Sequence, residues 1–194
     1  MYKPNLFDDT QGYDEFEALE LGGHICKILK VEETKSRSGK DMINIYIDIA
    51  EGRQKDYYLK SFQSDNRENK KYKGIVYQVV TDNNGNTNKG FKTFVDAVAK
   101  SNPGFNKDAI WGDNFSSHFK NKLIGGVFGR EQYKNQNGEL KWSTKCVKFR
   151  DVETIRKGVE VPEDKYLEIQ KQSQSFSSQD GFEGVIDSDG DLPF

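Results

Sequence analysis

Residues 42–50 constrain the fold of this chain more than any other segment. Isoleucine occupies every second position, with mostly polar residues between: Ile43, Ile45, Ile47 and Ile49 alternate with Met42, Asn44, Tyr46 and Asp48. Successive side chains of a strand point to opposite faces, so this pattern predicts a strand with one buried face and one wet face. Half-buried strands of this kind are typical of antiparallel sheets.

Four more strands are predicted, at residues 23–31, 56–62, 123–133 and 140–149. Asn137-Gly138 separates the last two strands, and Asn-Gly is a strong hairpin signal because a tight turn needs positive φ angles. The small, polar and basic residues of 34–41 predict the turn between the first two strands.

An amphipathic helix is predicted between the third and fourth strands. Its apolar residues recur at one helical face: Phe91, Phe94, Val95 and Val98. Asn102-Pro103-Gly104 ends this helix, a second short helical stretch is expected at 113–121, and the polar residues 63–90 predict a long loop insertion. The element order predicts a mainly β protein, a five-stranded OB-fold barrel with one helix between strands 3 and 4.

The net charge of −2 conceals an uneven distribution along the chain. Residues 1–21 carry six acidic residues and one basic residue, and residues 159–194 carry nine and two. Residues 22–158 hold 26 basic against 16 acidic residues, a net charge of +10. A basic body attracts polyanions such as nucleic acid; the alternative is a solvated, lysine-rich surface.

These charges and the composition suggest four parts. They are an acidic N-terminal arm (1–21), an OB-fold domain (22–158), an increasingly disordered linker rich in Gln, Ser, Asp and Gly (159–186) and an acidic tip (187–194).

The acidic tip has the form of a ligand for another protein. Three carboxylates precede an apolar ending: Asp187, Asp189 and Asp191, then Leu192, Pro193 and Phe194. A partner with an apolar pocket rimmed by Lys and Arg suits this peptide, and Pro193 lowers the entropy lost on docking. The alternative is a frayed, solvated terminus.

The tip and the element order together resemble those of bacterial and phage single-stranded DNA-binding proteins, most closely phage-encoded ones. The resemblance covers about residues 22–150 in element order and the tip in sequence. It implies a non-enzymatic protein that coats single-stranded DNA in replication, recombination or repair and recruits partner enzymes through its tip. The insertion at 63–90 departs from the compact bacterial form, so the oligomeric state stays open, with a homo-oligomer as one alternative.

A sequence-tolerant binder of single strands needs aromatic faces for bases and cations for phosphates. The expected DNA-binding residues are Tyr46 on the second strand; Tyr58, Lys60 and Phe62 on the third; Lys35, Arg37 and Lys40 in the first loop; and Arg130, Tyr133, Lys134, Lys141, Trp142 and Lys145 in the last hairpin. For Phe62 the alternative is a structural role, capping the end of the barrel.

No motif in the sequence indicates catalysis, a metal or a cofactor. There is no GxxxxGK[ST], HExxH or GxSxG, and the two cysteines, Cys26 and Cys146, stand alone and are expected to be buried, reduced thiols. Without a signal peptide or an apolar span, a cytoplasmic protein with no membrane contact is expected. The alternative function is an OB-fold protein-interaction module, or an accessory subunit of a replication or nuclease complex, that does not itself hold DNA.

Overall fold

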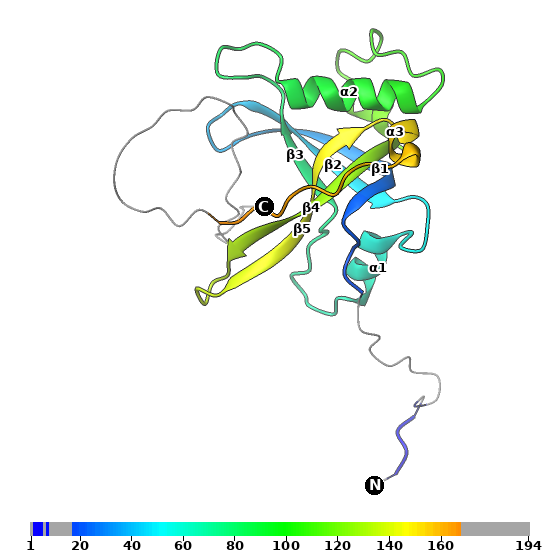
Figure 1. Ribbon diagram of the computed structural model, residues 1–194, viewed down its shortest axis with the longest axis vertical. Coiled ribbons are helices and arrows are strands. Elements are labelled where there is room, and N and C mark those ends of the chain that lie inside the picture. The colour runs from blue at the N-terminus through cyan, green and yellow to red at the C-terminus, as the bar shows by residue number, and fades with distance from the viewer. Residues whose placement is uncertain (1, 6, 8–16, 168–194) are drawn as a thin grey trace, which may run out of the picture.

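A computed structural model describes residues 2–5, 7 and 17–167 (Figure 1). In chain order the elements are β1 (Gly22–Lys35), β2 (Asp41–Ile49), α1 (Tyr57–Ser64), β3 (Ile75–Val79), α2 (Lys89–Ser101), the 3-10 helix η1 (Phe115–Phe119), β4 (Leu123–Lys134), β5 (Leu140–Arg150) and α3 (Val152–Lys157). The acidic tip and most of the linker lie outside the described residues.

The five strands form one antiparallel sheet in the order β3-β2-β1-β4-β5. The mainly β class and a five-stranded sheet are therefore confirmed, and four of the five strands lie where the sequence predicted them. Within the described part of the chain β3 and β5 are the two edges and do not pair, so the sheet is not closed into a barrel.

The prediction of a strand at 56–62 is wrong. Residues Tyr57–Ser64 form helix α1, and the third strand is β3, inside the segment predicted to be a long loop. The reason is a contact distant in sequence: the Asp48 carboxylate of β2 accepts hydrogen bonds from the backbone N–H groups of Tyr58 and Leu59, both at 2.9 Å. A carboxylate at the start of a helix satisfies N–H groups that have no partner within the helix.

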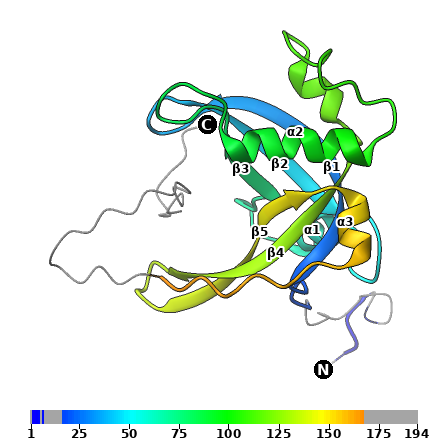
Figure 2. The same cartoon turned by 45° about the horizontal axis from the view of Figure 1, so that its top comes forward.

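The core lies between the sheet and α2. The four alternating isoleucines of β2 are at most 1% exposed, which confirms the buried face predicted for this strand. α2 lies across one end of the sheet (Figure 2), and its Phe94 ring stacks on Phe119 of η1 with centroids 5.0 Å apart. The Asn88 side chain begins α2 by accepting from the N–H groups of Gly90 and Phe91. Both predicted helical stretches are confirmed.

The β4–β5 hairpin projects from the sheet at the end opposite α2 (Figure 1). Its turn is closed by the Asn135 N–H, which donates to the Glu139 carbonyl at 2.9 Å, and Gly138 has φ 80°. The predicted hairpin is confirmed. Strand β1 pairs with β4 only from Gly22 to Lys27, so the outer half of β4 extends beyond β1.

The segment 159–167, called the strap here, fills that place beside β4 (Figure 2). The Lys165 N–H donates to the Arg130 carbonyl at 2.9 Å, and the Gln132 N–H donates to the Lys165 carbonyl at 2.8 Å. These two bonds form a parallel bridge between the strap and β4. The chain after α3 thus follows the hairpin instead of leaving the domain.

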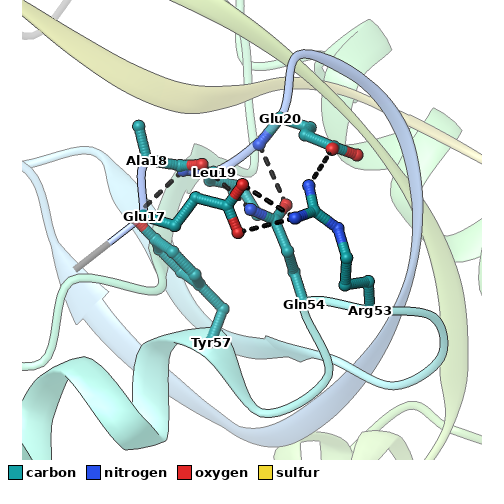
Figure 3. A network of polar contacts seen from close by, with 7 residues as sticks. All are labelled: Glu17, Ala18, Leu19, Glu20, Arg53, Gln54 and Tyr57. Atoms are coloured by element: carbon teal, nitrogen blue, oxygen red, sulfur yellow. Dashed lines mark hydrogen bonds and ion pairs between the residues drawn. The ribbon is translucent and has the colours of Figure 1, made fainter. Parts of the chain in front are cut away.

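The N-terminal segment 17–20 is held by the loop after β2 and by α1 (Figure 3). Leu19 is buried, and its N–H donates to the Tyr57 hydroxyl at 3.1 Å. The Gln54 side chain bonds the backbone on both sides of Leu19, and Arg53 pairs with Glu17 at 2.8 Å and also with Glu20. The packed unit therefore extends beyond 22–158 at both ends.

Candidate nucleic-acid interface

The outer face of the sheet, defined as the side opposite the isoleucines of β2, gathers aromatic and basic side chains. The strand register places Tyr46 of β2 between Lys30 of β1 and Ile75 of β3. The next row holds Asn44 beside Tyr77, whose side chain is 45% exposed. Three adjacent strands therefore contribute to one surface.

Tyr46 lies at the centre of this surface, as the sequence predicted from its position on the wet face. The Lys30 Nζ lies 4.2 Å from the centroid of its ring. Its hydroxyl donates to the Glu32 carboxylate at 2.7 Å. Partial burial, together with that carboxylate, raises the pKa of Tyr46 to about 12.

Further rings continue the surface away from β2. Tyr72 lies 6.3 Å from Tyr46 and 6.1 Å from Phe62 of α1, measured between ring centroids. The Lys70 Nζ lies 4.8 Å from the Phe62 centroid. We call the set the outer aromatic patch: Tyr46, Phe62, Tyr72 and Tyr77, with Lys30 and Lys70.

Four members of the outer aromatic patch were not predicted from the sequence: Lys30, Lys70, Tyr72 and Tyr77. Three of them lie within 63–90, which was expected to be a loop. The run from Ile75 to Val79 is rich in β-branched residues and includes Tyr77, and this composition is the signal that could have identified β3.

Tyr58 does not have the position predicted for it. It lies in the first turn of α1, 6% exposed, with its ring 6.1 Å from Tyr72 and 5.2 Å from Tyr57. Burial raises the pKa of its hydroxyl. The ring supports Tyr72 from the core side and offers no open face to a base. Lys60, also on α1, is exposed and its Nζ donates to the Lys55 carbonyl at 2.9 Å.

Asn44 contributes a polar group between the rings. Its side-chain oxygen is buried and has no hydrogen-bond partner within the described part of the chain. Buried acceptors are nearly always paired in folded proteins.

The first loop holds the three cations predicted there, Lys35, Arg37 and Lys40. Lys35 forms an ion pair with Asp41 at 2.6 Å, and Lys40 donates to the Asn83 side chain. Arg37 is exposed and makes no ion pair with any described residue. Of the three, Arg37 is therefore the one most available to a phosphate.

The β4–β5 hairpin divides its predicted aromatic and basic residues between its two faces: the register places Arg130, Lys134 and Trp142 on one face, and Tyr133, Lys141 and Lys145 on the other. Trp142 pairs with Gln132 in the strand register, and Arg130 lies two residues before Gln132 on the same face of β4. The Arg130 guanidinium lies 5.1 Å from the centroid of the Trp142 ring. Trp142 and Tyr133 are 39% and 41% exposed. The hairpin thus holds a ring and a cation in contact, the combination that single-strand binding requires.

Most of the hairpin cations already have acidic partners. Lys141 pairs with Glu139 at 3.2 Å, and Lys145 pairs with Glu131 at 3.3 Å. Lys134, the last residue of β4, is exposed. These pairs reduce the positive potential of the hairpin.

The strap supplies partners to the two central residues of the hairpin. The Arg130 Nε donates to the Asp164 carboxylate at 3.0 Å, and this bond lowers the pKa of Asp164. The Tyr166 ring lies edge-on to Trp142, with centroids 5.2 Å apart. These contacts between the strap and the hairpin were not predicted, since residues 159–186 were expected to be a linker.

The two thiols lie on either side of Gly126 in β4. Cys26 is fully buried and Cys146 is partly buried, and burial raises the pKa of both thiols. The residues that the structure describes include no cluster of three or more His, Cys, Asp or Glu that could hold a metal ion. Across the same residues, no helix has both the length and the apolar character needed to span a bilayer.

No protein-family model matches this sequence, and a search of curated proteins found no match either.

Proposed function

We propose that this protein binds single-stranded DNA without catalysing a reaction and coats it during replication, recombination or repair. The outer aromatic patch is the observation that carries the proposal. Its rings come from β2 (Tyr46), β3 (Tyr77), α1 (Phe62) and the segment between α1 and β3 (Tyr72), with Lys30 and Lys70 above two of them. Unpaired bases can stack on such rings while the cations follow the phosphates.

We also propose that the sheet belongs to an OB-fold with an open seam. The order β3-β2-β1-β4-β5 would close into a barrel if β3 met β5, and OB-folds are often only partly closed. In an OB-fold the ligand lies on strands 2 and 3 and is flanked by the loops 1-2 and 4-5. The outer aromatic patch, the first loop and the β4–β5 hairpin correspond to these three places.

The test compares the affinity for oligo(dT) with that for a duplex of equal length, measured by fluorescence anisotropy over a range of salt concentrations. We expect at least a tenfold preference for the single strand, because bases stacked in a duplex cannot reach the rings. Affinity should fall as salt is raised, since each neutralised phosphate releases counterions. Equal affinity for duplex, or the absence of a salt dependence, would contradict the proposal.

The second candidate is a protein-interaction module or an accessory subunit that does not hold DNA. The paired hairpin cations favour it, because Lys141, Lys145 and Arg130 already have carboxylate partners. This candidate predicts no measurable binding of oligo(dT) by the full chain even at low salt.

The acidic tip, residues 187–194, lies outside the described residues, and we propose that it recruits partner enzymes of DNA metabolism in the cytoplasm. Phe194→Ala keeps every acidic side chain and removes only a ring, so it should abolish capture of those partners. Deletion of 187–194 should leave DNA affinity unchanged or slightly higher. If the Phe194→Ala protein captures the same partners, the contact depends on charge alone.

A further inference from the structure

The strap places an acidic group and an aromatic ring on the two hairpin residues that suit a nucleotide. Asp164 contacts the Arg130 guanidinium, and Tyr166, two residues later, contacts the Trp142 ring. A carboxylate and a phosphate both accept paired hydrogen bonds from a guanidinium. A phenol ring and a base both pack on an indole. The strap therefore places at this site the two kinds of group that a nucleotide would bring, an anion on Arg130 and a ring on Trp142.

The two halves of the strap are attached differently. In its first half, apolar side chains cover glycines of the sheet: Val159 lies over Gly23 and Pro162 over Gly129. In its second half the contacts are two backbone hydrogen bonds to β4, two partly exposed ion pairs and the ring of Tyr166, which is 66% exposed. Exposed ion pairs add little to stability. The second half can therefore leave the hairpin while the first half stays in place, with the chain bending after Pro162.

Departure of the second half leaves the Glu131 carboxylate of the hairpin paired. Glu131 is paired with Lys165 of the strap at 2.7 Å and also with Lys145 of β5 at 3.3 Å. When Lys165 leaves, Lys145 still neutralises Glu131. Arg130 loses Asp164 and Trp142 loses Tyr166, and a phosphate and a base would replace these two partners.

We propose that the strap closes the Arg130–Trp142 site as an internal substitute for a nucleotide, and that single-stranded DNA opens this site by displacing residues 163–167. The inference rests on the function proposed above and concerns the regulation of the same interface. DNA binding and release of the strap are then coupled, and each favours the other to the same degree.

The decisive variants weaken the strap without touching the hairpin. Asp164→Asn and Tyr166→Ala, alone and combined, are compared with wild type for oligo(dT) affinity in the full chain. Glu163→Gln is the matched control, because it removes the same charge from an exposed neighbour in the strap. We expect the combined variant to bind about 3- to 30-fold more tightly and the control to stay within twofold of wild type.

Proteolysis gives a second readout that does not depend on affinity. The backbone N–H and carbonyl of Lys165 are both bonded to β4, so trypsin can cleave after Lys165 only when the strap has detached. Saturating oligo(dT) should speed this cleavage several-fold in wild type. The combined variant should be cleaved rapidly with or without DNA.

Three outcomes would overturn the inference. Unchanged affinity in the combined variant, with wild type binding normally, would show that the strap does not compete with DNA. Weaker binding would make the strap part of the DNA site. Protection of Lys165 by oligo(dT) would show that the strap and DNA are held together. If neither wild type nor any variant binds oligo(dT), the proposed function itself fails. If only the combined variant binds, the result supports a strap that fully closes the site in wild type.

Discussion

The outer aromatic patch and the β4–β5 hairpin both combine aromatic rings with cations, but the two regions hold them in different states. In the patch, Lys30 and Lys70 lie over rings that strands and a helix support from below. In the hairpin, Arg130 lies over Trp142, and the strap contacts both residues through Asp164 and Tyr166. The patch is held by the strands and helix that carry it, and Lys30 is paired with Glu32 at 2.6 Å. The hairpin is also contacted by the strap, although Trp142 stays 39% exposed.

Under the proposed function, this difference predicts an order of binding steps. The rings of the patch are already fixed by packing, so a base that stacks on them pays little conformational entropy. The hairpin must first lose its strap contacts, which lowers its net contribution. We therefore expect the patch to supply most of the initial affinity and the hairpin to add to it after the strap has moved.

The largest effect is expected from Asp48→Ala, which removes the support of the patch and leaves the hairpin untouched. The Asp48 carboxylate is buried and accepts from the N–H groups of Tyr58 and Leu59. Leaving these groups unpaired should lower the free energy of unfolding by about 3 kcal/mol, measured by chemical denaturation. Asp48→Asn keeps one acceptor oxygen and should lose less. An Asp48→Ala protein as stable as wild type would mean that α1 does not depend on this contact.

Tyr46→Ala tests the patch as a stacking surface. Loss of the ring should weaken oligo(dT) binding by about 1–3 kcal/mol, measured by anisotropy. Tyr46→Phe keeps the ring and loses only the hydroxyl bond to Glu32, so its affinity should stay close to that of wild type. Equal losses in the two variants would assign the effect to the hydroxyl and not to stacking.

Trp142→Ala tests the hairpin by the same measurement, the affinity for oligo(dT). In wild type it should cost less affinity than Tyr46→Ala, because Tyr166 already occupies part of the ring. In the Asp164→Asn, Tyr166→Ala background the cost should rise towards the full stacking contribution of about 1–3 kcal/mol. Fluorescence quenching of Trp142 by oligo(dT) is best read in a Trp111→Phe chain, since the protein has two tryptophans. An equal cost in both backgrounds would remove the distinction between open and covered sites.

The salt dependence of binding separates the cations of the two surfaces. Lys70→Ala should reduce the slope of log affinity against log salt by about 0.7, the value for one phosphate contact on a single strand. Lys145→Ala should reduce it by less, because Glu131 partly neutralises Lys145. If Lys145→Ala has the larger effect, phosphate follows the hairpin and not the patch.

The smallest effect concerns the titration of Tyr46. Folding raises the pKa of the Tyr46 hydroxyl from 10.0 to about 12. Between these two pH values the hydroxyl is protonated in the folded protein but ionised in the unfolded chain. Stability therefore falls as pH rises through this window. Tyr46→Phe should show a shallower fall over the same range, measured by denaturation at each pH. Parallel curves for the two proteins would mean that Tyr46 titrates normally.

Local patterns in the sequence determined several elements of this protein. The alternation of residues 42–49 defines β2, Asn137-Gly138 defines the hairpin, and the spacing from Phe91 to Val98 defines the buried face of α2. In each case the signal is periodicity or turn chemistry within a few residues, and the structure keeps what those residues prefer on their own. The same patterns placed Tyr46 and Trp142 on exposed strand faces.

The tertiary structure alone decided which of these residues have free surfaces. Residues 57–64 form a helix because the Asp48 carboxylate of the preceding strand, 10 and 11 residues away, accepts the N–H groups of Tyr58 and Leu59 in the first turn of α1. Tyr58 is buried as a consequence, and the third strand lies at Ile75–Val79 instead. Likewise Arg130 and Trp142 gain the contacts of Asp164 and Tyr166 because the chain after α3 returns along β4. Such contacts join positions far apart in the chain, and local preferences carry no information about which distant group will satisfy a backbone N–H or cover a ring.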